Sequence, residues 1–203
     1  MSLHALREAL IAHGGTVAAL VRTPFGGQDG AVQRSDGPVH GSDGAVHGYD
    51  GAARGPDGAA SQPGVGAPQR AARGPRTRAR AAEYELLLEM ILEGSLLHYG
   101  LPRVVATEDR DLALLLGDQL YALGLARLAE IGDLDSVREL SDLISLLSQA
   151  QLQGDERLAR AIWEAGATAI GWGATSEHEA AKELARAGDA AAVPALLSAA
   201  RAA

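Results

Sequence analysis

The longest apolar stretch of the chain runs from Asp111 to Ile131, with the sequence DLALLLGDQLYALGLARLAEI. Its leucines and alanines fall on every side of a helical wheel, and a helix that is apolar all round is normally buried all round. Asp118 and Arg127 interrupt it, so we expect the central helix of a soluble bundle and no transmembrane segment. Asp118 is then predicted to be a buried carboxylate that needs a partner, and Gly117 beside it to permit a close approach of another helix.

Helical periodicity predicts further helices on both sides of this stretch, and no segment alternates with period two, so we predict an all-α fold. The expected helices cover residues 3–22 (one helix, or two divided at Gly14-Gly15), 84–98, 134–153, 156–170, 176–187 and a last short segment containing Pro194. The Gly-Asp pairs at 132–133, 154–155 and 188–189 predict a glycine that ends one helix and an aspartate that caps the next. Ser176 and Glu179 have the spacing of a capping box.

Between the first helix and residue 80 the composition changes to Gly, Ala, Pro, Asp and Arg. Asp-Gly recurs every seven residues, at positions 29, 36, 43, 50 and 57. A seven-residue unit with two glycines and no large apolar side chain cannot bury enough surface to offset its ordering entropy. We therefore expect three parts: an N-terminal helix docked on the bundle (1–23), a disordered low-complexity linker (24–80) and a helical bundle domain (81–203).

The two parts of the 203-residue chain differ in net charge. Residues 1–80 carry a net charge of +3 and residues 81–203 a net charge of −11. The acidic helical part is a poor candidate for nucleic-acid binding. The arginines of the linker at 70, 73, 76, 78 and 80 can meet a phosphate surface, which includes proximity to a membrane, but we favour the simpler interpretation of a solvated linker. The chain has no cysteine and no evident secretory signal, so a cytoplasmic location is the default expectation.

The order of motifs between Glu89 and Gln153 resembles that of the trans-polyprenyl diphosphate synthases. In that family a helix carrying Asp-Asp-x-x-Asp runs into Arg-Arg-Gly-x-Pro and then into a long helix with Leu-x-Gly-Asp. Here Gly100-x-Pro102 is followed by LLGDQLY, which contains Gly117, Asp118 and Tyr121. The match covers about a third of the chain. It implies a partial isoprenoid-synthase-like bundle of antiparallel helices, in which Gly100, Pro102, Gly117, Asp118 and Tyr121 are structural or interface residues.

Alignment on Gly100 and Pro102 places Glu89, Met90 and Glu93 at the positions of the family's three aspartates. Met90 has no oxygen ligand for Mg²⁺, which needs several oxygens at about 2.1 Å, and we expect Glu89 and Glu93 to be a solvated acidic pair. His98 and Tyr99 stand where the family has two arginines that bind diphosphate. The sequence also shows no second Asp-rich helix. We therefore expect no catalytic, metal or cofactor residue in this chain.

The resemblance then implies a non-catalytic small subunit of a heteromeric long-chain synthase, similar to the heptaprenyl diphosphate synthase component-one family. Its partner is expected to be the catalytic polyprenyl diphosphate synthase subunit, which carries the Mg²⁺, and the pair is expected to make the prenyl tail of a quinone. A helical scaffold of solenoid type is an alternative, suggested by GDLDSVREL at Gly132 and GDAAAVPAL at Gly188. A stand-alone enzyme in which Glu89 and Glu93 still bind a metal is a third.

Overall fold

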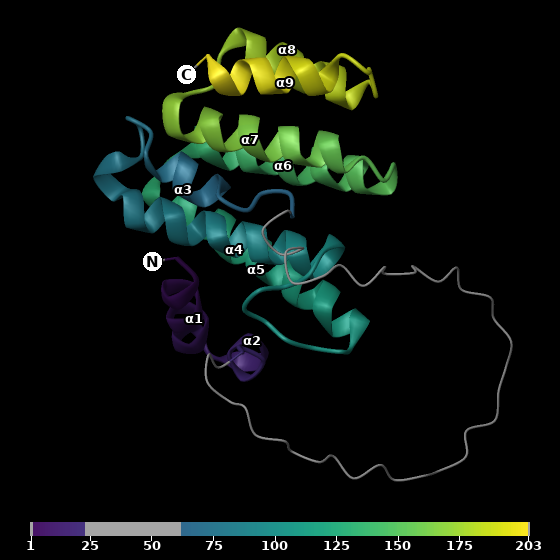
Figure 1. Cartoon of the computed structure of the whole chain (residues 1–203). Coiled ribbons are helices and arrows are strands. Elements are labelled where there is room, and N and C mark those ends of the chain that lie inside the picture. Colours follow the sequence, from purple (N-terminus) through teal and green to yellow (C-terminus); the bar gives the residue numbers. More distant parts are fainter. Residues whose placement is uncertain (1, 23–61, 203) are drawn as a thin grey trace, which may run out of the picture.

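The computed structural model describes residues 2–22 and 62–202, and this part of the chain is mostly helical without a β-strand, which confirms the all-α prediction. The helices are α1 (Ser2–His13), α2 (Gly15–Ala19), α3 (Ala67–Ala72), α4 (Ala81–Tyr99), α5 (Arg110–Ile131), α6 (Leu134–Leu152), α7 (Glu156–Trp172), α8 (Ser176–Arg186) and α9 (Ala192–Arg201). They stack in layers, from α8 and α9 through α7 and α6 to α3, α4 and α5, with α1 and α2 at the opposite end (Figure 1). The heptapeptide repeat lies outside the described residues.

Short polar caps determine where most of the long helices begin. The Asp109 side chain accepts hydrogen bonds from two amides of the first turn of α5, and Asp133 and Asp155 each accept one such bond at the start of α6 and α7. Gly132 and Gly154 have φ angles of 81° and 67°, as the predicted Gly-Asp boundaries require. The predicted capping box at Ser176 is wrong, because the N-cap of α8 is Thr175, whose hydroxyl accepts from the His178 amide.

The helix that is buried all round is α4, and not α5 as the sequence predicted. Every residue of α4 from 87 to 97 is buried, because α3, α5 and α1 all pack against it. In α5 only six residues are buried: Ala113, Leu116, Gly117, Leu120, Gly124 and Leu128. Asp118 points away from this buried face, with 71 % of its side chain exposed, so its predicted burial is wrong.

Glycines bring α4 and α5 into close contact, as expected for Gly117. A Cβ atom on Gly94 would lie 2.9 Å from the Gly117 carbonyl oxygen, and one on Gly117 would lie 2.6 Å from the His98 ring. Further along the contact, a Cβ atom on Gly124 would lie 2.7 Å from Ile91. The two backbones therefore approach more closely than any side chain at these positions would allow.

The folded body begins near residue 62 rather than at Ala81, which corrects the predicted linker over residues 62–80. Helix α3 packs against both α4 and α7, and it buries Ala67, Pro68, Ala71 and Ala72. At the end of the segment the Thr77 hydroxyl donates to the Ala71 carbonyl. Alanine and glycine suffice here because the segment fills a shallow gap between two helices, which composition alone does not reveal.

The N-terminal helices form a second, smaller core at the outer side of α4 and α5. Leu6, Leu10 and Val17 are fully buried there together with Val104 and Val105. The backbone joins the same parts, since Val21 and Val105 form an antiparallel bridge. The segment 101–106 after α4 thus connects the N-terminal helices to the bundle.

The α4–α5 contact can be tested with Gly94→Ala. The new methyl group meets backbone that cannot move aside, so the free energy of unfolding should fall by about 1–3 kcal/mol, despite a gain of up to about 1 kcal/mol in helix propensity. Chemical denaturation measures this difference. Gly166→Ala is the matched control, because its methyl group is crowded only by the end of the Leu143 side chain, at 2.7 Å, and meets Glu139 Oε1 at an ordinary contact distance of 3.5 Å. An equal effect of both substitutions would contradict the proposed backbone contact.

Candidate functional site

Glu89 and Glu93 are buried, with relative exposures of 1 % and 0 %, so the predicted solvated acidic pair is wrong. Both side chains face the segment that follows α4. One carboxylate oxygen of Glu93 accepts hydrogen bonds from the amides of Val104 (2.6 Å) and Val105 (3.0 Å), and the other accepts from the Arg103 amide (3.1 Å). A carboxylate in the core is thereby supplied with donors from three consecutive amides.

The Arg103 guanidinium is the cation between the two glutamates. It forms an ion pair of 2.5 Å with Glu89 and lies 3.5 Å from Glu93. The Gln69 side chain donates to the second oxygen of Glu89 at 2.9 Å. These two carboxylates, at two of the positions aligned with a metal-binding motif, are therefore occupied by a cation of the chain itself. The sequence signal that could have revealed this is Arg103 next to Pro102, ten residues after Glu93.

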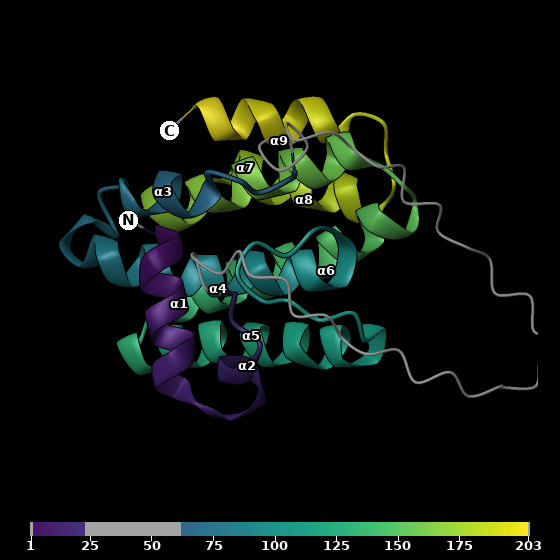
Figure 2. The same cartoon turned by 60° about the horizontal axis from the view of Figure 1, so that its bottom comes forward.

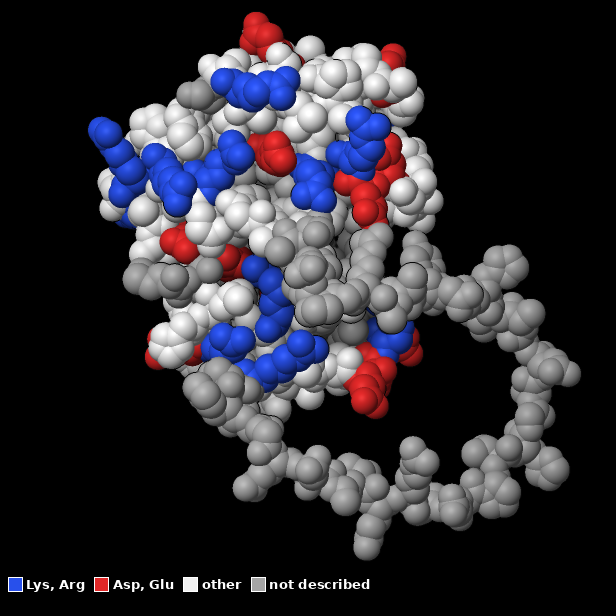
Figure 3. Space-filling model, in the orientation of Figure 1, with Lys and Arg blue, Asp and Glu red and all other residues white. Residues whose placement is uncertain are grey.

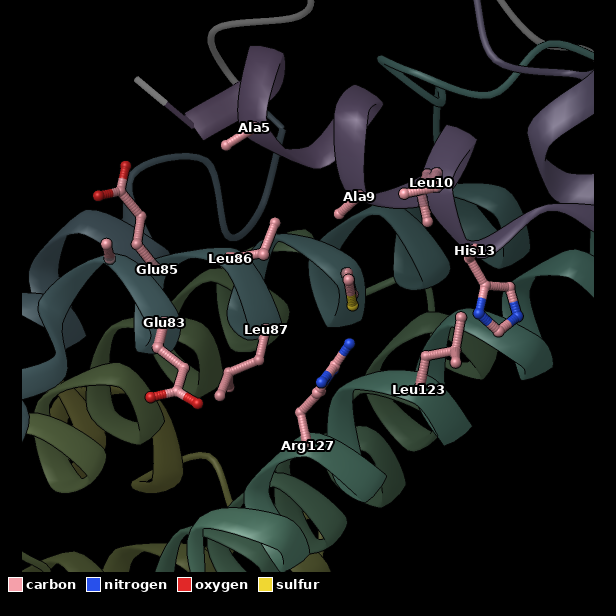
Figure 4. Close-up of a pocket in the computed structure, with 13 residues that line it drawn as sticks. Ala5, Ala9, Leu10, His13, Glu83, Glu85, Leu86, Leu87, Leu123 and Arg127 are labelled. Carbon is pink, nitrogen blue, oxygen red and sulfur yellow. The ribbon is translucent and has the colours of Figure 1, made fainter.

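Met90 belongs to a different surface of α4. It lines a cavity of about 730 Å³ between α1, α4 and α5. In Figure 4 the walls carry Ala5, Ala9 and Leu10 of α1, Leu86 and Leu87 of α4, and Leu123 of α5, and Arg127 points into the opening. Glu83, Glu85 and His13 stand at the rim. A cavity of this size with mostly apolar walls and few polar groups can hold an apolar ligand.

The remaining motif residues position the end of α4. His98 stacks on Tyr121, with ring centroids 5.3 Å apart, and its Nε2 atom lies 3.1 Å from Asp118. Burial raises the pKa of Tyr121 well above its ordinary value. Gly100 ends α4, and Gln62 Oε1, which accepts from the Leu101 amide at 2.8 Å, would lie only 2.6 Å from a Cβ atom on Gly100. Pro102 is half-buried and precedes Arg103. Gly100 and Pro102 thus lead into the 101–106 segment, whereas Gly117, Asp118 and Tyr121 lie at the contact between α4 and α5, and none of them forms a site with Glu89 and Glu93.

A second polar cluster, which the sequence did not reveal, joins α6 to α8. The Lys182 side chain is 2 % exposed, and its ammonium group lies 2.9 Å from Glu139, 2.7 Å from Asp142 and 3.0 Å from Glu179. Glu139 also contacts His178 at 2.7 Å. Although Glu139, His178 and Glu179 have the spacing of metal ligands, the Lys182 ammonium already supplies the positive charge there. The cluster therefore acts as an internal salt-bridge network.

No protein-family model, no curated protein and no solved structure matches this chain. The functional argument consequently depends on the geometry above and on the motif resemblance.

Removal of one partner tests the Glu89–Arg103–Glu93 cluster. Glu93→Ala should lower the free energy of unfolding by about 3–5 kcal/mol, because it leaves the amides of Arg103, Val104 and Val105 without their acceptor and removes one of the two carboxylates that neutralise the Arg103 guanidinium. Glu83→Ala is the control: Glu83 lies on the same helix, is exposed and faces Arg80 at 3.7 Å, and its loss should cost less than about 1 kcal/mol. Denaturant titration measures both, and a loss below about 1 kcal/mol for Glu93→Ala would show that the cluster is not a core interaction.

The pKa values of two aspartates, Asp133 and Asp142, determine how the free energy of unfolding should depend on pH. Burial alone would raise the pKa of Asp133 and Asp142, but hydrogen bonds from Tyr84 and Ser136, and from Lys182 and Arg186, hold each pKa below the ordinary 3.8. A carboxyl group of this kind contributes stability above its unfolded-state pKa and loses it as the pH falls through the folded-state pKa. The pKa of Lys182 is raised above its ordinary 10.5, so its contribution is complete throughout the acidic range.

The free energy of unfolding should therefore decrease as the pH is lowered from about 5 to about 2. Urea denaturation at several pH values measures this slope. Asp142→Asn should flatten it, whereas Asp135→Asn, at a side chain that is 83 % exposed, should leave it nearly unchanged. A pH-independent stability over this range would contradict the assignment.

Proposed function

We propose that this chain is a non-catalytic accessory subunit of a heteromeric trans-polyprenyl diphosphate synthase, in line with the motif resemblance. It binds the catalytic subunit, which carries the Mg²⁺, and it helps to set the length of the product. The observation that carries the proposal is the uncovered apolar surface of α5.

The outer face of α5, defined here as Leu115, Asp118, Ala122, Ala126 and Ala129, consists of exposed residues at helical spacing. Leu115 is 66 % exposed. In Figure 2, α5 lies along the lower edge of the bundle, with α4 and α6 on its inner side. An apolar helix that presents leucine and alanine to solvent is typical of a surface that another protein covers.

A membrane is a poorer occupant of this face than a protein. Among the described residues α5 is the one helix that is long and apolar enough to cross a bilayer by length and composition. However, Asp118 lies near its middle on the exposed face, and a carboxylate there would cost about 2.5–3.5 kcal/mol in a bilayer. In a protein interface the same carboxylate can meet a donor of the partner.

Two further features support the accessory role. Arg103 neutralises the carboxylates at the aligned motif positions, which leaves them without free oxygens for the metal cluster of a synthase. The cavity beside Met90 has apolar walls that can accept part of a growing hydrocarbon chain.

The solenoid alternative has less support. The two Gly-Asp segments that suggested it begin helices of unlike length, α6 with 19 residues and α9 with 10. A stand-alone metal-dependent enzyme would need to release Glu89 and Glu93 from Arg103 and the 101–106 amides.

Co-expression with a synthase that has both Asp-rich motifs and is encoded beside this chain tests the proposal. The wild-type chain should co-purify with that synthase, and the pair, but neither protein alone, should make long-chain prenyl diphosphate. Ala122→Glu with Ala126→Glu should weaken the complex by about 2 kcal/mol or more, roughly 30-fold in Kd, because two charges become buried at the interface.

Ala174→Glu with Ala180→Glu provides a control of equal charge at exposed residues near and on α8, and this variant should assemble normally. Absence of a complex with the wild-type chain would refute the proposal, as would normal assembly of the α5 variant or magnesium-dependent turnover by the purified chain alone.

A further inference from the structure

The segment 62–80 concentrates positive charge in an otherwise acidic protein. It contains five arginines, at positions 70, 73, 76, 78 and 80, and no Asp or Glu. The rest of the chain carries a net charge of −13. Such an uneven distribution of charge indicates what kind of partner a protein attracts, and it says little about the fold.

The segment that carries these arginines is not a linker, because it packs against α7. Gly74 packs directly against Gly171 of α7, where a Cβ atom would overlap the backbone. The Arg76 amide donates to the Gly171 carbonyl at 3.0 Å, and the Arg76 side chain reaches the Ile170 carbonyl and Asp133. Arg76 therefore serves the fold and attaches the segment to α7.

Three of the other arginines are available for a partner. Arg70, Arg73 and Arg78 are exposed, and within residues 2–22 and 62–202 the structure gives none of them an acidic partner. Arg70 lies in α3 and Arg73, three residues later, is its C-cap residue in helical conformation, so the two lie on the same face, away from the buried alanines. Figure 3 shows basic side chains in a row over α3 and along α7. We call Arg70, Arg73 and Arg78 the arginine patch.

We propose that the arginine patch docks this protein on an anionic membrane surface. Arginine guanidinium groups bind phosphates in a bidentate manner, and the three side chains of the patch are exposed to a partner surface. Val65, which is 41 % exposed, and the exposed Pro75 lie in the same segment and supply apolar contacts at the headgroup boundary.

A nucleic acid is the less favoured partner. Single-stranded nucleic acids are bound through base stacking on aromatic side chains, and the segment 62–80 has no aromatic residue. Groove binding needs a protruding helix, whereas α3 has six residues and is packed between α4 and α7.

The acidity of the remaining surface does not prevent the interaction. Charges separated by more than about 8 Å at physiological ionic strength are largely screened, so the residues nearest the bilayer dominate. Each arginine near an anionic surface contributes a factor of about five to the partition coefficient. Removal of all three charges of the patch should then weaken binding on the order of a hundredfold.

Vesicle flotation with the full chain tests this inference. Vesicles of phosphatidylcholine with phosphatidylglycerol should bind the wild-type protein, and vesicles of phosphatidylcholine alone should not. Arg70→Gln with Arg73→Gln and Arg78→Gln should lose binding by about the factor given above. The corresponding triple Lys variant, which keeps the charge, should bind.

The matched control is Arg22→Gln with Arg138→Gln and Arg201→Gln, which removes the same charge from exposed residues outside the segment 62–80 and should bind normally. Thermal unfolding of every variant verifies that it is folded. The inference is overturned if the wild-type protein ignores anionic vesicles or if both Gln triples lose binding equally. It is also overturned if the patch binds a fluorescent 20-nucleotide DNA or RNA more tightly than it binds the vesicles.

Discussion

The burial of two carboxylates in the middle of α4 is the constraint on which the rest of this structure depends. An unpaired carboxylate in a protein core costs several kcal/mol, so Glu89 and Glu93 require donors on their side of the helix. The segment 101–106 provides them through Arg103 and three amides. The same segment then presents Val104 and Val105 to the N-terminal helices. A charge requirement inside α4 thereby determines how the chain turns after α4 and where α1 and α2 pack.

The close contact of α4 and α5 explains why much of α5 remains exposed on the outer surface. Because Gly94, Gly117 and Gly124 let the two backbones meet on one narrow face, α5 buries only that face. Its remaining leucines and alanines stay at the surface, where they form the region that we assign to a partner subunit. The arginine patch lies on the other side of α4, over α3 and α7, so the proposed subunit contact and the proposed membrane contact use separate surfaces.

The sequence predicted the helical class, most helix boundaries and the role of Gly117, because these depend on local periodicity, on Asp caps and on glycines with positive φ. It drew attention to positions 89, 90 and 93 through the motif resemblance, but it did not reveal their environment. An acidic pair at i, i+4 is solvated in most helices, and only the path of the 101–106 segment shows that Arg103 covers this one.

Tertiary structure alone decided which apolar helix is central. Both α4 and α5 have apolar residues on all sides, and a helical wheel cannot show how many neighbours a helix will have. It also decided that residues 62–80 fold, since alanine and glycine become favourable only where α4 and α7 leave a shallow gap between them. Helix formation depends on residues a few positions apart, whereas burial depends on surfaces that the sequence brings together from distant positions.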